Sequence, residues 1–183
     1  MDNGASSYRR FLDGDKNAFG EIVDELMYGL IYFINSYVHD FHTAEDIAMD
    51  VLADLIANRH RYNFKVKLKT YLYMVARNRA LDCLKHRKVY KQTELSEDIE
   101  ASDDISQLEK AVLTSERKRA LSLAMSQLPQ DMREALHLVY FEEMSYDEAS
   151  KVMKKSKKQL DNLLYRGKKE LFVLLGEEGK QLI

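Results

Sequence analysis

The scarcity of residues that interrupt helices is the feature of this chain that most restricts its fold. Its 183 residues include seven Gly and a single Pro, Pro129. A sheet of several strands needs many tight turns, and Gly and Pro are the residues that most often form them. Apolar residues instead recur at helical spacing, as at Phe19, Ile22, Leu26 and Leu30. The sequence therefore predicts an all-α fold.

The expected helices fall into two groups, separated by an acidic stretch. Residues 94–109 hold seven acids and no Lys or Arg. This composition, which is also poor in apolar residues, is typical of a flexible linker. Because 45% of the chain is apolar, each side of the stretch can form a core. We expect two small helical domains, 1–89 and 108–183, joined by an acidic flexible linker over 90–107.

Several protein classes are excluded by residues or motifs that the chain lacks. Cys83 is the only cysteine, which rules out an internal disulfide and a multi-cysteine zinc site. His39 and His42 match no zinc-binding spacing, so we expect no metal. The chain has no Gly-rich phosphate loop and no Ser or Cys nucleophile motif, so we expect neither an enzyme nor a cofactor. It has no run of about 18 apolar residues and no signal-peptide pattern at its start, which predicts a cytoplasmic protein without membrane insertion.

Charge is strongly segregated along the sequence, although the net charge is only −2. Residues 1–58 hold eleven acids and three Lys or Arg, whereas residues 59–91 hold eleven Lys or Arg and the single acid Asp82. Residues 151–169 are also basic, with eight Lys or Arg and the single acid Asp161. Binding to a polyanion depends on local patches rather than on total charge. The two basic blocks therefore predict two nucleic-acid-binding surfaces, one in each domain.

The first basic block mixes cations with aromatic residues. Residues 59–66 lack helical periodicity and are predicted to form a loop, and a helix is predicted over about 67–88. Cations can follow a phosphate backbone while aromatic faces accept unstacked bases, so this mixture is typical of proteins that hold single-stranded nucleic acid. For Tyr71 and Tyr73, which have helical spacing, packing in the core is the alternative. Arg79 projects toward the apolar face of the predicted helix, and the sequence alone offers no reason for this.

Residues 145–169 have the layout of a helix-turn-helix unit. Ser145 with Glu148, and Ser156 with Gln159, fit the capping-box pattern that begins helices. In the second helix an apolar face can pack on the domain while the opposite face meets the major groove of DNA, although such basic faces are also often merely solvated. The residues expected to bind DNA here are Ser156, Lys157, Lys158, Gln159, Asn162, Tyr165, Arg166 and Lys169.

Four segments, spread in order over nearly the whole chain, resemble motifs of the extracytoplasmic-function (ECF) sigma factors. They are residues 14–19, 43–47, 69–82 and 128–148. The resemblance implies that the second segment, Thr43-Ala44-Glu45-Asp46-Ile47, docks on the clamp coiled coil of core RNA polymerase. The residues expected at this contact are Glu45, Asp46, Met49 and Asp50.

The resemblance also assigns the two basic blocks to the two elements of a promoter. It implies that the first block binds the −10 element as the strands open, and that the helix-turn-helix unit binds the −35 element as a duplex. Either Asn63 or Asn78 is expected to donate or accept hydrogen bonds at a base edge. The residues expected at the −10 element are Arg61, Tyr62, Asn63, Phe64, Lys65, Lys67, Lys69, Tyr71, Tyr73, Arg77, Asn78, Asp82 and Lys85.

The chain departs from the family pattern at several of these sites. Met49 stands where the family usually has Gln, Tyr71 where it has Trp, and Lys154 where it has a turn Gly. Gln159, Asp161 and Leu163 also differ from the residues common in the reading helix. The family's −35 preference is therefore not carried over to this chain.

The sequence thus predicts a sigma factor that binds core RNA polymerase and promoter DNA, both duplex and single-stranded, to initiate transcription. An anti-sigma factor is a further partner that the resemblance leaves open. Two other classes stay open at this point. A stand-alone helix-turn-helix regulator would bind duplex DNA without polymerase, and a purely interacting helical protein would bind polymerase without starting transcripts.

Overall fold

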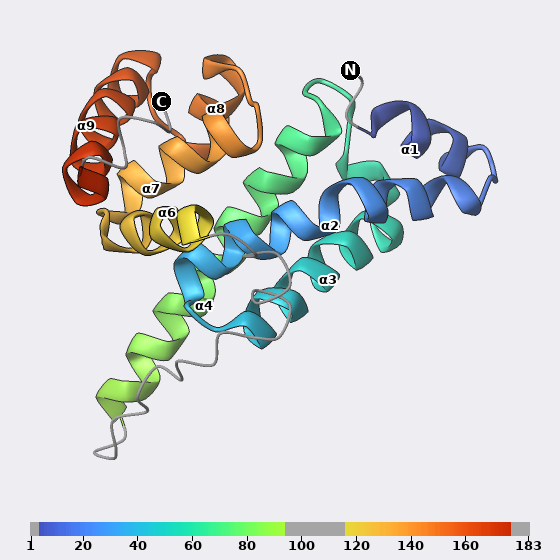
Figure 1. Cartoon of the computed structure of the whole chain (residues 1–183). Helices are drawn as coiled ribbons and strands as arrows, with labels where there is room; N and C mark the ends of the chain where they lie inside the picture. The colour runs from blue at the N-terminus through green and yellow to red at the C-terminus, as the bar shows by residue number, and fades with distance from the viewer. Residues whose placement is uncertain (1–3, 94–115, 177–183) are drawn as a thin grey trace. The chain divides into compact units, whose positions relative to one another are not determined.

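The computed structural model describes residues 4–93 and 116–176, and the chain divides into two compact units, Met1–Asp98 and Ile99–Ile183. The described residues are helical and contain no β-strand (Figure 1). The predicted all-α fold with two domains is confirmed. Residues 94–107 of the predicted linker and residues 108–115 lie outside the described residues, so the predicted domain boundaries stay predictions. None of the described helices is long and apolar enough to cross a membrane.

The first unit is built around three long helices. Its elements are α1 (Ala5–Leu12), α2 (Asn17–Val38), α3 (Phe41–Ala57), the 3-10 turn η1 (Arg59–Arg61) and α4 (Leu68–Thr93). α2, α3 and α4 pack on one another, and α1 packs on α2 (Figure 1). The apolar face predicted for this helix is confirmed at four positions, since Leu68, Leu72, Ala76 and Ala80 are fully buried.

At the corner between α2 and α3, the sequence predicts a helix with Thr43 as its N-cap and Glu45 and Asp46 in its first turn, and the structure corrects this start. Thr43 fits the cap of α3 by its sequence, but Asp40 occupies that position in an extended conformation, and its carboxylate accepts hydrogen bonds from the backbone N–H and the hydroxyl of Thr43. His39 ends α2 in the left-handed conformation, and α3 begins at Phe41, three residues before the start that a cap at Thr43 would give. Arg87 of α4 donates to the carbonyl of Val38 and to Asp40, so the end of α4 is fixed to this corner.

The second unit contains shorter helices. They are α6 (Glu116–Gln127), α7 (Gln130–Leu136), the π-helical turn η2 (His137–Phe141), α8 (Tyr146–Met153) and α9 (Lys157–Leu175). Pro129 separates α6 from α7, because proline disfavours the helical conformation of the residue before it. α9 packs on α6, α7 and α8. Gly167 allows the close approach of α9 to α7, because a Cβ there would lie 3.1 Å from Leu136 Cδ1.

Both predicted capping boxes are present. The backbone N–H of Ser145 donates to Glu148 Oε2 at 2.9 Å, and the backbone N–H of Ser156 donates to Gln159 Oε1 at 2.8 Å. Lys154, which stands at the family's turn glycine, adopts φ 54° and ψ 42°. A non-glycine residue in this left-handed region costs roughly 1 kcal/mol, so the tight turn is retained with some strain.

Replacement of Asp40 by Ala tests the capping role of its carboxylate. The hydrogen bonds from Thr43, and then the Arg87 guanidinium, hold the pKa of Asp40 below its usual value. The ionised carboxylate therefore adds stability above the unfolded-state pKa of about 3.9, and this contribution is lost as the pH falls through the lower folded-state value. Loss of such a cap costs about 1 kcal/mol.

We expect urea unfolding of the first unit, followed by circular dichroism, to show Asp40→Ala about 1 kcal/mol less stable than the parent at pH 7. The gap should shrink as the pH is lowered below about 4. Asp13→Ala, at an exposed acid in the α1–α2 turn, serves as the control. A gap of equal size at pH 7 and at pH 3 would contradict the role given to the ionised carboxylate.

Candidate nucleic-acid and partner interfaces

One face of α3 is exposed and combines acids with apolar side chains. Its members recur every three or four residues, and we call them the α3 outer face: Asp46, Met49, Asp50, Ala53 and Ile56. Met49 and Ile56 are 52% and 40% exposed, so two large apolar residues lie on the same helix face as the acids. Glu45 is half-buried beside this face, and Ile56 is a member that the sequence prediction missed.

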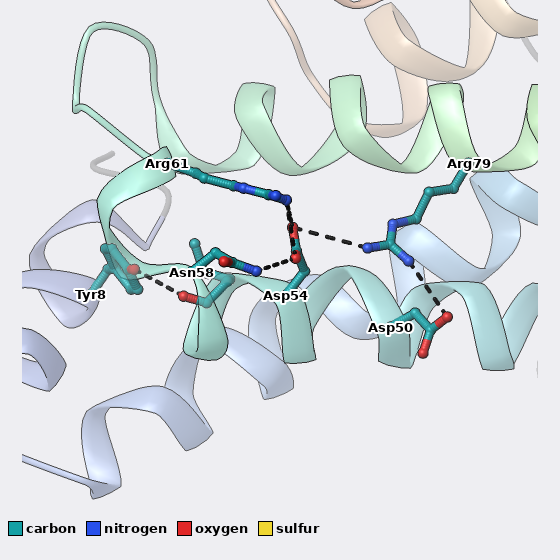
Figure 2. A network of polar contacts seen from close by, with 7 residues as sticks. Tyr8, Asp50, Asp54, Asn58, Arg61 and Arg79 are labelled. Atoms are coloured by element: carbon teal, nitrogen blue, oxygen red, sulfur yellow. Dashed lines mark hydrogen bonds and ion pairs between the residues drawn. The ribbon is translucent and has the colours of Figure 1, made fainter.

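The adjacent side of α3 carries a carboxylate that joins three elements. Asp54 accepts a hydrogen bond from Asn58 Nδ2 at 2.6 Å, and Arg61 NH1 in η1 lies 3.1 Å and 3.2 Å from its two oxygens. Arg79 NH2 of α4 lies 3.9 Å from the same carboxylate. Figure 2 shows Asp54 between the two guanidinium groups, which reach it from the loop and from α4. Because the Asp54 side chain is only 17% exposed, solvent screens these contacts less than it screens a fully exposed pair.

The same network explains the orientation of Arg79. Its second guanidinium contact is Asp50 Oδ2 at 3.4 Å, at the edge of the α3 outer face (Figure 2). Arg79 points toward the buried side of α4 because its partners lie on α3, which packs there. The sequence indicated the direction of this side chain but could not reveal acids that lie 25 and 29 residues earlier.

An aromatic cluster supports the loop that precedes α4. The ring of Tyr62 lies 5.6 Å from Tyr8, 4.6 Å from Phe64 and 5.2 Å from Tyr71. Tyr8 is fully buried and donates a hydrogen bond to the carbonyl of Leu55, which anchors α1 to the end of α3. Tyr62 donates to the carbonyl of Val66 at 2.8 Å, which closes the loop on itself.

Two of the predicted base-stacking residues are core residues in this structure. Tyr62 is 3% exposed within the aromatic cluster, and Tyr73 is fully buried with its ring 5.0 Å from Phe33. The prediction that these two rings meet DNA is therefore corrected, because neither presents a face to solvent. Tyr73 packs in the core, which is the alternative that its helical spacing left open. Tyr62 is buried because it contacts residues that are distant in the sequence, such as Tyr8. Phe64 and Tyr71 remain half-exposed.

A guanidinium group lies over one ring of the loop and over one ring of α1. The guanidinium of Arg9 lies 4.9 Å from the centre of the Phe64 ring, and that of Arg59 lies 4.8 Å from the Phe11 ring. Phe64 has φ 60°, and the neighbouring Asn63 side chain accepts a hydrogen bond from the Lys65 backbone N–H. A strained loop conformation held by such contacts is a common feature of binding sites. Arg9 was missed by the sequence prediction, because it lies in α1, far from the basic block.

Tyr71 lies between the loop and the Asp54 network. Burial, and then the negative charge of Asp54, raises the pKa of Tyr71 above its usual value. Further along α4, the predicted face is exposed at Asn78, Asp82 and Lys85, and Lys85 forms an ion pair with Asp82 at 3.0 Å.

The helix-turn-helix unit presents the polar side of α9 to solvent. Lys158, Asn162, Arg166 and Lys169 are exposed, and Tyr165 is 69% exposed. The opposite side packs in the core of the unit through Leu160, Leu164 and Gly167. The division of α9 into a packed face and a polar basic face is therefore confirmed, whereas contact of that face with DNA stays a prediction.

Comparison with known protein families bears on both units. The model described as "Sigma-70 region 2" matches residues 22–89, and the one described as "Sigma-70, region 4" matches residues 118–171. The chain is also 32% identical over 154 residues to the ECF RNA polymerase sigma factor SigM of Bacillus subtilis, covering 84% of this chain and 93% of the relative. The chain belongs to the ECF sigma factors.

Further relatives agree with this assignment. The sigma factor is 33% identical over 150 residues to the RNA polymerase sigma-H factor of Pseudomonas aeruginosa, covering 76% of this chain and 77% of that one. Its fold is similar to that of RpoE from Bartonella quintana, solved in complex with the anti-sigma factor NepR, with a TM-score of 0.63 at 22% identity and coverage of 86% and 96%. CnrH, solved with the cytosolic domain of CnrY, gives a TM-score of 0.63 at 18% identity and coverage of 94% of both chains. The predicted family is confirmed, and a stand-alone regulator is not favoured.

Proposed function

We propose that this sigma factor binds core RNA polymerase through α3, the −10 element through the loop before α4 and α4 itself, and the −35 element through α9. The observation that carries the proposal is the position of Asp54, whose carboxylate holds the loop and α4 against the helix that bears the α3 outer face. A protein that must bring a polymerase and an opening DNA strand together needs both surfaces on one well-packed body. The proposal adds no catalytic site to the chain and places the protein in the cytoplasm.

The α3 outer face fits a protein partner better than it fits DNA. Its acids repel phosphate, while exposed Met and aliphatic side chains are typical of surfaces that become buried on association. We expect Met49 and Ile56 to pack against the polymerase while Asp46 and Asp50 meet its basic residues. Glu45, which is half-buried, would lie at the edge of this contact.

The loop and α4 fit an unpaired strand. Phe64 and Tyr71 offer half-exposed rings, and Asn63 and Asn78 are exposed amides that can reach a base edge. Extrusion of a base from the duplex costs a few kcal/mol, and stacking on an aromatic ring at roughly 1–3 kcal/mol per base can offset it. The proposed −10 contacts are Arg61, Asn63, Phe64, Lys65, Lys67, Lys69, Tyr71, Arg77, Asn78, Asp82 and Lys85.

The exposed face of α9 fits the major groove of a duplex. Exposed Lys and Arg can bind phosphates, while Asn162 and Gln159 can reach base edges. The proposed −35 contacts are Ser156, Lys157, Lys158, Gln159, Asn162, Tyr165, Arg166 and Lys169. Three of these have local roles as well, because Ser156 and Gln159 form the capping box of α9 and Lys157 forms an ion pair with Asp147 at 2.7 Å.

An anti-sigma factor is a further proposed partner. The B. quintana relative of similar fold was solved in complex with one. The apolar residues of the α3 outer face are accessible to an inhibitor as well as to polymerase. We therefore propose that such an inhibitor would compete with polymerase for that face.

Charge reversal at Asp46 tests the polymerase contact. Asp46→Lys places a cation where the partner is expected to be basic, so we expect the affinity for core RNA polymerase to fall by roughly tenfold or more. Fluorescence anisotropy of the labelled chain, titrated with core enzyme, measures this. Asp13→Lys makes the same charge change at an exposed turn outside the α3 outer face and should bind normally. Unchanged affinity of Asp46→Lys would remove α3 from the interface.

Truncation of Arg166 tests the −35 contact. Removal of one phosphate-binding cation should flatten the slope of log K against log salt concentration by roughly 0.9. We expect holoenzyme with Arg166→Ala to bind a promoter fragment more weakly, with a correspondingly flatter salt dependence. Arg119→Ala, at an exposed cation of α6 in the same unit, is the control. If affinity and slope both stay at the parent values, Arg166 does not contact DNA.

A further inference from the structure

A small hollow lies on the exposed face of α9. Its volume is about 190 Å³, and its lining residues are Lys155, Gln159, Asn162, Leu163 and Arg166. Gln159 and Leu163 are four residues apart on one helix, so their side chains are neighbours on this face. The hollow therefore brings an amide and an apolar side chain together on the surface that is proposed to enter the major groove.

The capping box restricts how Gln159 can take part in recognition. Its Oε1 accepts the backbone N–H of Ser156 at 2.8 Å. Because a backbone N–H can only donate, the oxygen of the amide must be the atom that faces it. The Nε2 amino group is then left to face outward, as a donor. A Gln that reads adenine needs its oxygen and its nitrogen together, so Gln159 cannot make that bidentate contact while it caps α9.

Leu163 further restricts which base can occupy the hollow. It is half-buried, and it gives the hollow an apolar part beside the amino group of Gln159. In the major groove, thymine alone presents an acceptor, O4, next to an apolar group, its C5 methyl. Cytosine presents a donor at N4 instead, and guanine presents two acceptors but no methyl group.

We propose that this hollow receives one thymine of the −35 element, with O4 accepting from Gln159 Nε2 and the C5 methyl packed on Leu163. The inference rests on the proposed function of α9 and names the base that this part of the helix reads. It gives Gln159 two simultaneous tasks, capping with its oxygen and reading with its nitrogen. The selectivity follows from the cap, since the same residue with a free amide would have no such preference.

The Gln159→Glu variant separates the two tasks of this residue. A glutamate at this position can still form the capping box with Ser156, since Glu148 forms one with Ser145 in α8. The start of α9 should therefore remain capped. Its second carboxylate oxygen, however, is an acceptor where Gln159 has a donor. The preferred base at the position that faces the hollow should therefore change from thymine to cytosine, whose N4 amino group donates.

Holoenzyme and a promoter library with a randomised −35 element provide the measurement. Run-off transcripts that carry a barcode for each template report which sequences are used. With the parent chain we expect thymine to be enriched at one position, and with Gln159→Glu we expect the ratio of thymine to cytosine there to fall by roughly tenfold or more. Glu148→Gln makes the reverse exchange in the other capping box and should leave the base preferences unchanged.

Removal of the methyl group alone tests Leu163. Uracil in place of the selected thymine keeps O4 and removes the methyl, and burial of a group of this size corresponds to roughly a fourfold change in affinity. We expect parent holoenzyme to bind the uracil promoter about fourfold more weakly, and Leu163→Ala holoenzyme to bind the two promoters equally.

Three results would overturn the inference while the proposed function stands, and the first two are transcription without enriched thymine and enriched thymine that Gln159→Glu leaves unchanged. Equal binding of thymine and uracil promoters by the parent would remove Leu163 from the contact and overturn the inference as stated. If no member of the library gave a transcript with the parent chain, the proposed function would fail and this inference with it.

Discussion

The half-buried carboxylate of Asp54 is the interaction on which the first unit's function depends. An exposed ion pair contributes little to stability, but Asp54 gathers Asn58, Arg61 and Arg79 around one carboxylate that is largely shielded from solvent. These partners come from the end of α3, from the loop and from α4. The helix that carries the α3 outer face is thereby connected directly to the elements proposed to hold the opened strand. The contacts of Asp54, the longest of which is 3.9 Å to Arg79 NH2, therefore join the two surfaces.

The aromatic residues in and beneath the loop must meet two opposing demands. Bases can stack only on rings that face solvent, yet a loop without regular structure needs a core of its own to hold its shape. The structure divides these tasks, since Tyr8 and Tyr62 are buried under the loop while Phe64 and Tyr71 stay half-exposed. The guanidinium of Arg9 over Phe64 and that of Arg59 over Phe11 place positive charge beside this aromatic surface. The resulting surface suits a strand that carries both phosphates and unstacked bases.

Features determined by local sequence were predictable, and features determined by distant contacts were not. Both capping boxes and the break at Pro129 depend on residues within one helical turn, so a short pattern identifies them. The burial of Tyr62 depends on Tyr8, and the direction of Arg79 depends on Asp50 and Asp54, which only the packing of the helices brings near. The start of α3 was misplaced because Thr43 and Asp40 both suit a cap, and contacts with Arg87 of α4 stabilise Asp40 in that role. The hollow beside Gln159 also required the structure, because a sequence pattern shows which amide atom a capping box engages but not which side chains line a surface hollow.

The measurement that tests this account most directly is run-off transcription with a chain in which Asp54 is changed to Asn. Asparagine is similar in shape but cannot form the two ion pairs, while the α3 outer face is untouched. If Asp54 couples the two surfaces, the variant should bind core RNA polymerase with parental affinity yet give several-fold fewer transcripts from a duplex promoter, and a promoter opened beforehand by mismatches around the −10 element should restore much of the loss. Parental transcript levels from the duplex promoter would contradict the coupling that we assign to this carboxylate.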